Sequence, residues 1–358
     1  MVVCAGSGGV GKTTISAAIG VRAAHLGRRT LVLTVDPAKR LATALGISLS
    51  DDKDKRVVLT YAAGDKAGEL YAAVIDSKKI FDQFISKHAN RPDIASRIMK
   101  NRLYQQMSTT LSGSQEFTAL ERLLQSTESG AYDLVILDTP PTKHAMDFLT
   151  APQRISALFQ DAVTRWFMAP GEKSSGFFAG LVSRGTRTVL KSLETLTGAE
   201  FIEELIDFFA ALRSVQQVLR ERSERVRDLL TGDKTKFIVV TSFDAAKLLE
   251  ARYLQGELHK LGYKMQAVVI NRAFPIGLED DLGGAPAGAD PAAYEKVLDF
   301  YKRFKEYYHK RFSLYEEFSM NLDKSVAIVR VPEYQRDVYG IEDLEKLSSM
   351  LSGVLSQS

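Results

Sequence analysis

Short runs of apolar, mostly β-branched residues recur along the chain, and stretches with helical periodicity separate most of them. Eight runs are expected to form strands: residues 2–5, 30–35, 57–61, 70–75, 132–138, 236–241, 265–271 and 326–331. Several runs are apolar almost throughout, which is typical of strands buried on both faces. The pattern predicts an α/β fold with a doubly wound, mostly parallel sheet wrapped by helices.

Two long segments, residues 77–127 and 151–231, contain no clear strand and exceed what one crossover helix needs. We expect them to be α-helical insertions that together form a subdomain. Residues 1–76, 128–150 and 232–358 are then expected to form the core that contains the sheet.

The second of these segments carries an apolar stripe. The stripe alternates spacings of three and four residues, with an interruption at Arg222: Phe201, Leu205, Phe208, Leu212, Val215, Leu219, Val226 and Leu229. This spacing predicts a helix packed on a neighbour, although a ligand-facing surface would show the same pattern. Earlier in the segment, adjacent Phe177 and Phe178 lie between glycines. They favour a mobile apolar loop that contacts a partner, and a loop folded onto its own domain is the alternative.

Two helices are expected after a Gly-, Ala- and Pro-rich loop at residues 277–291. The first, residues 294–318, mixes aromatic and basic residues with interspersed acidic ones. Because a nucleic-acid surface needs a basic face, we expect instead a buried aromatic face and a solvated charged face. The second, residues 344–358, has four leucines at helical spacing and a single lysine. It is expected to be a packed terminal helix rather than a basic membrane-binding one.

Composition narrows the class of protein. Hydrophobic residues make up 45% of the chain, enough for a sizeable core, and the net charge is only +3, so nucleic acid is not expected as a partner. The single cysteine, Cys4, can form neither an intramolecular disulfide nor a thiolate cluster, which fits a reducing compartment. No apolar run reaches the ~18 residues of a membrane span, and no secretory leader precedes the first motif. We expect a cytoplasmic protein.

A glycine-rich loop stands between the first predicted strand and the first predicted helix, and it matches the pattern GxxxxGK[ST]. Such a loop needs glycines because its backbone N–H groups turn inward to phosphate oxygens. Its lysine adds a charge at the β and γ phosphates, and its hydroxyl can bind Mg²⁺. The helix N-terminus adds a favourable dipole. The residues expected to contact a nucleotide are Gly6, Ser7, Gly8, Gly9, Val10, Gly11, Lys12, Thr13 and Thr14, with Thr13 on the metal.

Polar residues end three of the predicted strands. Asp36 and Asp138 each follow an apolar run, at the sheet edge where a Mg²⁺–phosphate group would lie, although either could instead cap a helix. Asn271 ends another run, and its amide offers a donor and an acceptor to an adenine edge. A turn-forming asparagine is the alternative.

Five segments, in this order, resemble the ATPase family that includes the arsenite-efflux pump ATPase and the guided-entry factor for tail-anchored membrane proteins. They are GSGGVGKTT, TVDPAKRL, ILDTPPTKHAMDFL, VVIN and VPEYQRDVYGIEDLEKL, and the resemblance covers most of the chain. It implies a P-loop ATPase of the deviant Walker A type that uses ATP and Mg²⁺. Such proteins dimerise face to face with nucleotide at the interface. In targeting members, the helical insertions form an apolar groove that shields the client's membrane helix.

The resemblance also implies roles for single residues. Asp36 matches the residue that positions or activates the attacking water, Asp138 the residue that reaches Mg²⁺ through water, and Asn271 the residue that contacts adenine. Val331 and Pro332 fall where a C-terminal loop lies against the base.

The dimer contacts raise a question, because Ser7 stands where the family's signature lysine reaches the partner's phosphates. Glu250 is the nearest match to a glutamate that contacts nucleotide across the dimer. Lys39 or Arg40 could supply the missing cation, although both are typical of solvated surface charge. The chain also lacks a CxxC zinc motif and the thiolates that arsenite requires.

Three functions follow from these observations. The leading one is an ATPase that couples its nucleotide state to the binding of an apolar or membrane-protein client. The second is a nucleotide-gated, slowly hydrolysing subunit that forms a heterodimer with a lysine-containing paralogue instead of a homodimer. The third is a membrane-surface positioning ATPase, which would need a basic amphipathic tail.

Overall fold

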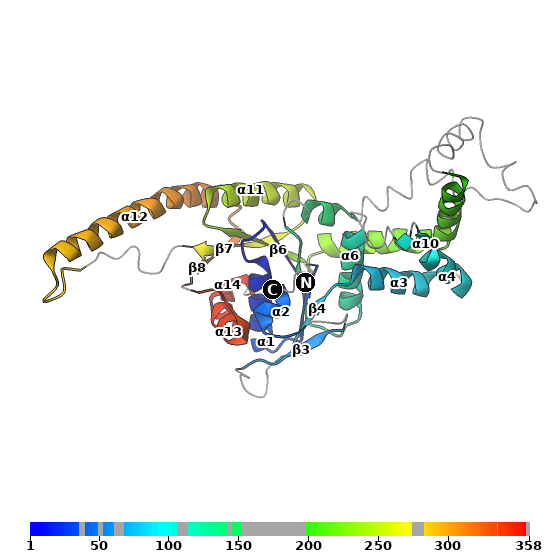
Figure 1. Ribbon diagram of the computed structural model, residues 1–358, viewed down its shortest axis with the longest axis horizontal. Coiled ribbons are helices and arrows are strands. Elements are labelled where there is room, and N and C mark those ends of the chain that lie inside the picture. Colours follow the sequence, from blue (N-terminus) through cyan, green and yellow to red (C-terminus); the bar gives the residue numbers. More distant parts are fainter. Residues whose placement is uncertain are drawn as a thin grey trace, which may run out of the picture. The chain divides into compact units, whose positions relative to one another are not determined.

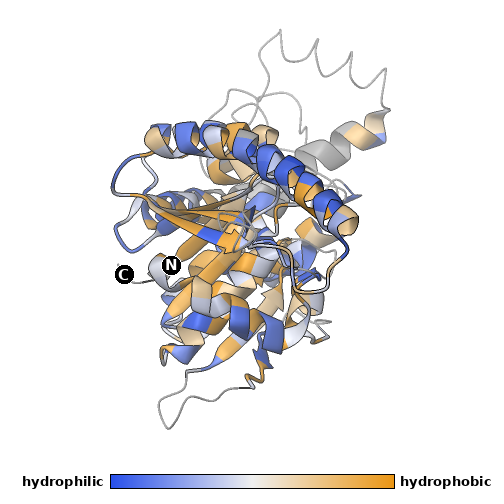
Figure 2. Ribbon diagram, turned by 90° about the vertical axis from the view of Figure 1, so that its left-hand side faces the viewer, coloured by the Kyte–Doolittle hydropathy of each residue, from blue (hydrophilic) through white to orange (hydrophobic). Residues whose placement is uncertain are grey.

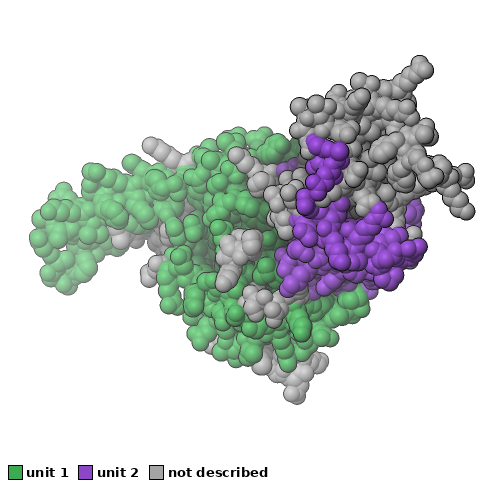
Figure 3. Space-filling view, turned by 45° about the vertical axis from the view of Figure 1, so that its right-hand side comes forward, with its two compact units in different colours: residues 1–74, 129–146, 231–358 green, residues 75–128, 147–230 purple. Residues whose placement is uncertain are grey.

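The computed structural model describes residues 1–35, 40–48, 53–60, 68–89, 91–102, 104–105, 114–141, 145–151, 198–273, 283–334 and 336–355. The chain divides into two units (Figure 3). The first unit comprises Met1–Val74, Ser129–Met146 and Thr231–Ser358, and the second comprises Ile75–Glu128 and Asp147–Leu230.

An eight-stranded sheet forms the centre of the first unit, in the order β3-β4-β2-β5-β1-β6-β7-β8 (Figure 1). The strands are β1 Val2–Gly6, β2 Thr30–Thr34, β3 Lys55–Val57, β4 Leu70–Val74, β5 Leu134–Asp138, β6 Lys236–Ser242, β7 Met265–Ala273 and β8 Ala327–Pro332. All neighbouring pairs are parallel except β3 with β4, so the predicted α/β class is confirmed.

The edge strand β3 differs from its prediction. It begins before the apolar run at residues 57–61 and pairs antiparallel with β4. Lys55 and Arg56 are exposed and only Val57 is buried, because an edge strand needs to bury little of its own surface.

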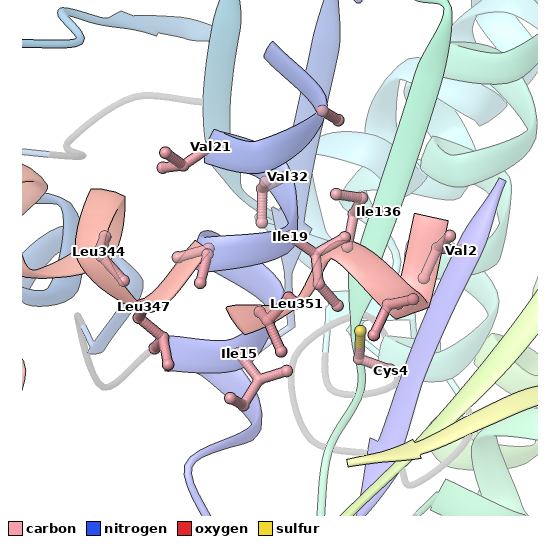
Figure 4. Close-up of a cluster of buried hydrophobic side chains, with 14 of the residues drawn as sticks. Val2, Cys4, Ile15, Ile19, Val21, Val32, Ile136, Leu344, Leu347 and Leu351 are labelled. Carbon is pink, nitrogen blue, oxygen red and sulfur yellow. The ribbon is translucent and has the colours of Figure 1, made fainter. Parts of the chain in front are cut away.

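The helices of the first unit include α1 Lys12–His25, α2 Arg40–Leu45, α11 Ala245–Lys260, α12 Pro291–Met320, α13 Gly340–Met350 and α14 Ser352–Leu355. The strands are mostly hydrophobic, whereas the helices carry many hydrophilic residues (Figure 2). Side chains from α1, α13 and the strands form one apolar cluster (Figure 4). Leu344, Leu347 and Leu351 belong to this cluster, so the expected packing of the C-terminal leucines is confirmed for these three. The expected single helix is divided, because α13 ends at Met350 and α14 begins at Ser352.

The long helix α12 corrects the expectation of a buried aromatic face. Tyr308 and Phe318 are buried, but Phe300 is 68% exposed and Tyr307 is 50% exposed. Spacing at i and i+4 showed only that the aromatic residues share a face. On that face Phe300 stacks on Phe304, with ring centroids 5.9 Å apart. Part of the aromatic face thus packs along its own helix.

The second unit is helical in its described residues, with α3 Ser77–His88, α4 Pro92–Lys100, α6 Ser114–Glu128 and α10 Ala199–Thr231. Val215 and Leu219 of α10 pack in one cluster with Phe84 of α3 and Phe117 of α6. This part of the predicted stripe is therefore a packed helix face.

Arg222 interrupts that stripe for a reason visible in the structure. Its guanidinium donates to both carboxylate oxygens of the fully buried Glu121, at 2.9 and 2.8 Å, and to Glu128 at 2.8 Å. The charge on the buried side of α10 is thus neutralised by α6. Among the described residues, no helix combines the length and apolar character that a membrane span requires.

Candidate nucleotide site

The glycine-rich loop connects β1 to α1 and is shaped by two close approaches of its backbone. A Cβ atom added at Gly6 would lie 2.0 Å from the carbonyl oxygen of Val240 on the neighbouring strand. Gly11 has a φ of +87°, and a Cβ there would lie 2.4 Å from Nδ2 of Asn271. The two framing glycines of the motif are therefore required by steric contact as well as by backbone conformation.

Lys12 begins α1 and is nearly buried beside the loop. Its Nζ donates to the carbonyl oxygen of Ser7 at 2.8 Å, so the ammonium group lies within the loop rather than in solvent. Gly11 provides no side-chain cap for α1. The first N–H groups of the helix therefore point toward the loop without competition from a capping side chain, which is the arrangement that binds phosphate.

Asp138 ends β5 and gathers hydroxyl groups from two other elements. Its Oδ2 accepts from Thr13 of α1 at 2.6 Å and from Thr34 of β2 at 2.9 Å, and its side chain is 2% exposed. Carboxylate and hydroxyl oxygens are the hard donors that Mg²⁺ prefers, and such sites use one or two carboxylates with substrate phosphates and water. The described residues hold no group of three or more His, Cys, Asp or Glu side chains arranged for a metal. The Thr13–Asp138 pair fits a metal ion shared with a phosphate ligand.

Asn271 contacts the loop directly. Its Nδ2 donates to the carbonyl oxygen of Val10 at 2.8 Å. The next residue, Arg272, has a φ of +52°, a conformation that is uncommon for residues other than glycine. The sequence led us to expect the Asn271 amide at an adenine edge, and here its N–H group holds the loop.

Thr139, the residue after β5, holds the strand β1 that leads into the glycine-rich loop. Thr139 donates through Oγ1 to the carbonyl oxygen of Cys4 at 2.9 Å.

Burial raises the pKa of the Cys4 thiol to about 12, so this thiol stays protonated near neutral pH and is chemically inert there.

Ser7 and Glu250 lie close together in one chain. The Ser7 hydroxyl holds the pKa of the Glu250 carboxyl below its ordinary value, and Lys247, 3.1 Å from Glu250, adds to that effect. Ser7 Oγ nevertheless makes no hydrogen bond of regular geometry within the described part of the chain. Ser7 is 1% exposed, so its hydroxyl is buried and does not face solvent.

The other predicted residues divide into two groups. Val331 is fully buried in the apolar cluster, and Pro332 pairs with Ala273 at the end of β8. Asp36, Lys39, Phe177 and Phe178 lie outside the described residues, so the roles expected of them stay predictions.

Sequence reasoning missed three residues that contact predicted site residues or the strand before the loop: Thr34 donates to Asp138, Thr139 donates to Cys4, and Lys247 pairs with Glu250. Thr34 and Thr139 were recognisable in principle, because each stands at or next to a strand end at the carboxyl edge of the sheet. Lys247 has no comparable signal, because a lysine in the first turn of a helix is usually a solvated charge.

Comparison with known proteins agrees with this geometry. Residues 1–353 match the model of a family described as anion-transporting ATPase. Two proteins named ATPase get3, from Aspergillus terreus and Aspergillus niger, are each 26% identical to this chain over 348 residues. Each alignment covers 97% of this chain and 88% of the relative. The chain therefore belongs to the anion-transporting ATPase family.

Proposed function

We propose that this ATPase binds Mg²⁺–ATP at the loop between β1 and α1 and couples its nucleotide state to the binding of an apolar client by its helical unit. The observation that carries the nucleotide site is the Asp138 carboxylate, which accepts from Thr13 and Thr34 beside the buried Lys12.

Each residue of the site has one task in this proposal. Lys12 exchanges the Ser7 carbonyl oxygen for phosphate oxygens, which are stronger acceptors because they are charged. The Thr13 hydroxyl offers a lone pair to the metal and continues to donate its hydrogen bond to Asp138. When bound, Mg²⁺ neutralises charge that develops on the phosphates. Asp36 positions the attacking water.

Calorimetry with ATP, in the presence and absence of Mg²⁺, tests these tasks. Lys12→Ala should abolish binding, and Thr13→Ala should remove the gain in affinity that Mg²⁺ gives. Thr13→Ser keeps the hydroxyl and serves as the matched control, with near-normal Mg²⁺ dependence. Equal ATP affinity in the parent and Lys12→Ala would refute the assignment of the site.

The client-binding part of the proposal concerns the helical unit. Support comes from the length of the second insertion and from the adjacent Phe177 and Phe178. Phe177→Ser with Phe178→Ser should weaken capture of an apolar helical peptide and leave ATPase rate and melting temperature unchanged. Phe201→Ser removes a phenylalanine that is 37% exposed on α10 and is the control. Failure of the parent protein to bind any apolar peptide would remove the chaperone function.

A second function is favoured by Ser7, which brings no charge to the loop. In this alternative the chain is a slow, nucleotide-gated subunit that pairs with a lysine-containing paralogue. The ATPase rate, measured against protein concentration with and without such a paralogue, separates the two functions. A rate that rises with concentration for this chain alone supports a homodimer. A rate that rises only on mixing supports the heterodimer.

A further inference from the structure

Ser7 follows β1, and the neighbour of β1 on one side of the sheet is β6. Gly6 pairs with Val240 of β6, and β6 leads within a few residues into α11. In Figure 1, α11 lies beside β6 and β7. Because α11 begins three residues after the end of β6 and also contacts β1, its first turn lies at the sheet edge where the loop begins.

That first turn holds a lysine in a fixed place. The carbonyl oxygen of Lys247 accepts from Thr241 Oγ1 of β6 at 2.9 Å, and its N–H donates to Asp244, the N-cap of α11, at 3.4 Å. The Lys247 ammonium lies 3.1 Å from the Glu250 carboxylate, the group that also lies by Ser7. Lys247 and Glu250 thus form an ion pair at the start of α11, a helix that also contacts β1, the strand that leads into Ser7.

We propose that Lys247 brings a phosphate-binding cation to the ATP site of its own chain, on the side of the loop where Ser7 leaves no charge. This inference rests on the proposed ATP site. Lys247 leaves Glu250 for the terminal phosphate of ATP, and Glu250 is a positioning residue that keeps the ammonium group next to the loop.

The energetics favour this exchange. The Lys247 and Glu250 side chains are 31% and 43% exposed, and an exposed ion pair contributes little to stability. A terminal phosphate carries more charge than a carboxylate, and in the proposed site the glycine-rich loop would hold that phosphate in place. The four-carbon stem of lysine is flexible, so its charge can move between the two partners without a change in the helix.

The same helix provides a matched control. Lys260 lies 2.7 Å from Glu257, also three residues apart, at the opposite end of α11. Lys247→Met and Lys260→Met each remove one charge from an i, i+3 pair on α11 and keep an apolar stem. Only the first removes a charge beside the loop.

The decisive measurement is the ratio of ATP to ADP affinity, determined by calorimetry, with the ATPase rate as a second readout. Lys247→Met should lower the ratio and the rate at least tenfold, Lys247→Arg should keep most of both, and Lys260→Met should match the parent. The loss of rate should not exceed the contribution of about 10³–10⁵-fold that a cation makes to phosphoryl transfer in other enzymes.

Two results would overturn the inference. One is a Lys247→Met variant that matches Lys260→Met in ratio and rate. The other is a Lys247→Arg variant that loses as much as Lys247→Met, because the effect would then not be one of charge. If Arg40→Met alone lowers the ratio, the cation comes from α2 instead. ATP binding by Lys12→Ala would instead refute the proposed site itself, so the two failures are distinguishable.

Discussion

Gly11 is the loop position at which one added methyl group tests the geometry most sharply. Its φ is +87°, and a Cβ would lie 2.4 Å from Asn271 Nδ2, the atom that donates to Val10 O. Gly9 has a similar φ of +78°, but a Cβ there would meet nothing within 4 Å. Gly11→Ala and Gly9→Ala therefore share the backbone strain and differ in the collision with Asn271.

The expected magnitudes follow from these contacts. A left-handed backbone costs an L residue about 1–2 kcal/mol, and this applies to both variants. In Gly11→Ala the Asn271 amide must also move away, which loses a hydrogen bond worth about 1 kcal/mol. We expect Gly9→Ala to lower the free energy of unfolding by about 1–2 kcal/mol and Gly11→Ala by about 2–3 kcal/mol.

Urea denaturation followed by circular dichroism measures this difference, provided that the slopes agree. The comparison is then repeated in an Asn271→Ala background, which removes the amide that the new methyl group meets. There the two alanine variants should cost the same. If Gly11→Ala and Gly9→Ala already agree within about 0.3 kcal/mol in the parent background, the contact between the loop and Asn271 is not made, and the reasoning fails.

Three further predictions concern catalysis, a buried ion pair and the thiol. Asp36→Asn should keep ATP affinity while turnover falls at least tenfold, about 1.4 kcal/mol in barrier height, and unchanged turnover in a single-turnover assay would rule out its role. Arg222→Leu should lower the free energy of unfolding by about 3–5 kcal/mol, because Glu121 would keep a buried charge without its partner. Arg220→Leu, at an exposed ion pair, is the control and should change the free energy of unfolding by less than about 0.5 kcal/mol. Equal urea midpoints for the two variants would contradict this prediction. Burial raises the pKa of Cys4 from 9.0 to about 12, so the unfolded state loses the thiol proton first. The free energy of unfolding should therefore be undiminished below pH 9 and fall as the pH rises toward 12, and Cys4→Ala should lack this part of the slope.

The sequence was sufficient to predict the sheet because its central strands are apolar on both faces. The run at residues 134–138 allows hardly any other structure once helices flank it, and the structure places β5 there. The strand-end rule also places Asp138 near the loop, and the structure brings it to Thr13, 125 residues away in the chain. Backbone hydrogen bonding in parallel strands fixes both results.

Other features could not be predicted because several partners satisfy the same chemistry. The Asn271 amide can donate to an adenine or to a backbone carbonyl, and only the fold shows that Val10 lies within reach. The spacing of Phe300 and Phe304 shows that they share a face of α12, but it does not show whether a neighbour covers that face. The contact of Lys247 with Glu250 follows from helical spacing, whereas the nearness of Glu250 to Ser7 depends on the pairing of β1 with β6.

If the nucleotide state is coupled to the helical unit as proposed, the bond between Thr13 and Asp138 is the first contact to consider. A hydroxyl has one hydrogen to donate and lone pairs to share, so Thr13 can stay bonded to Asp138 whether or not it binds a cation. That bond therefore does not distinguish ATP from ADP. A state-dependent contact must come from groups that reach the terminal phosphate. Beyond Thr139 the chain has Pro140 and Pro141, which lack N–H groups, so residue 142 carries the next backbone donor. The chain enters the second unit at Asp147, a few residues later, so under the proposed coupling a change at residue 142 would have a short covalent path to that unit.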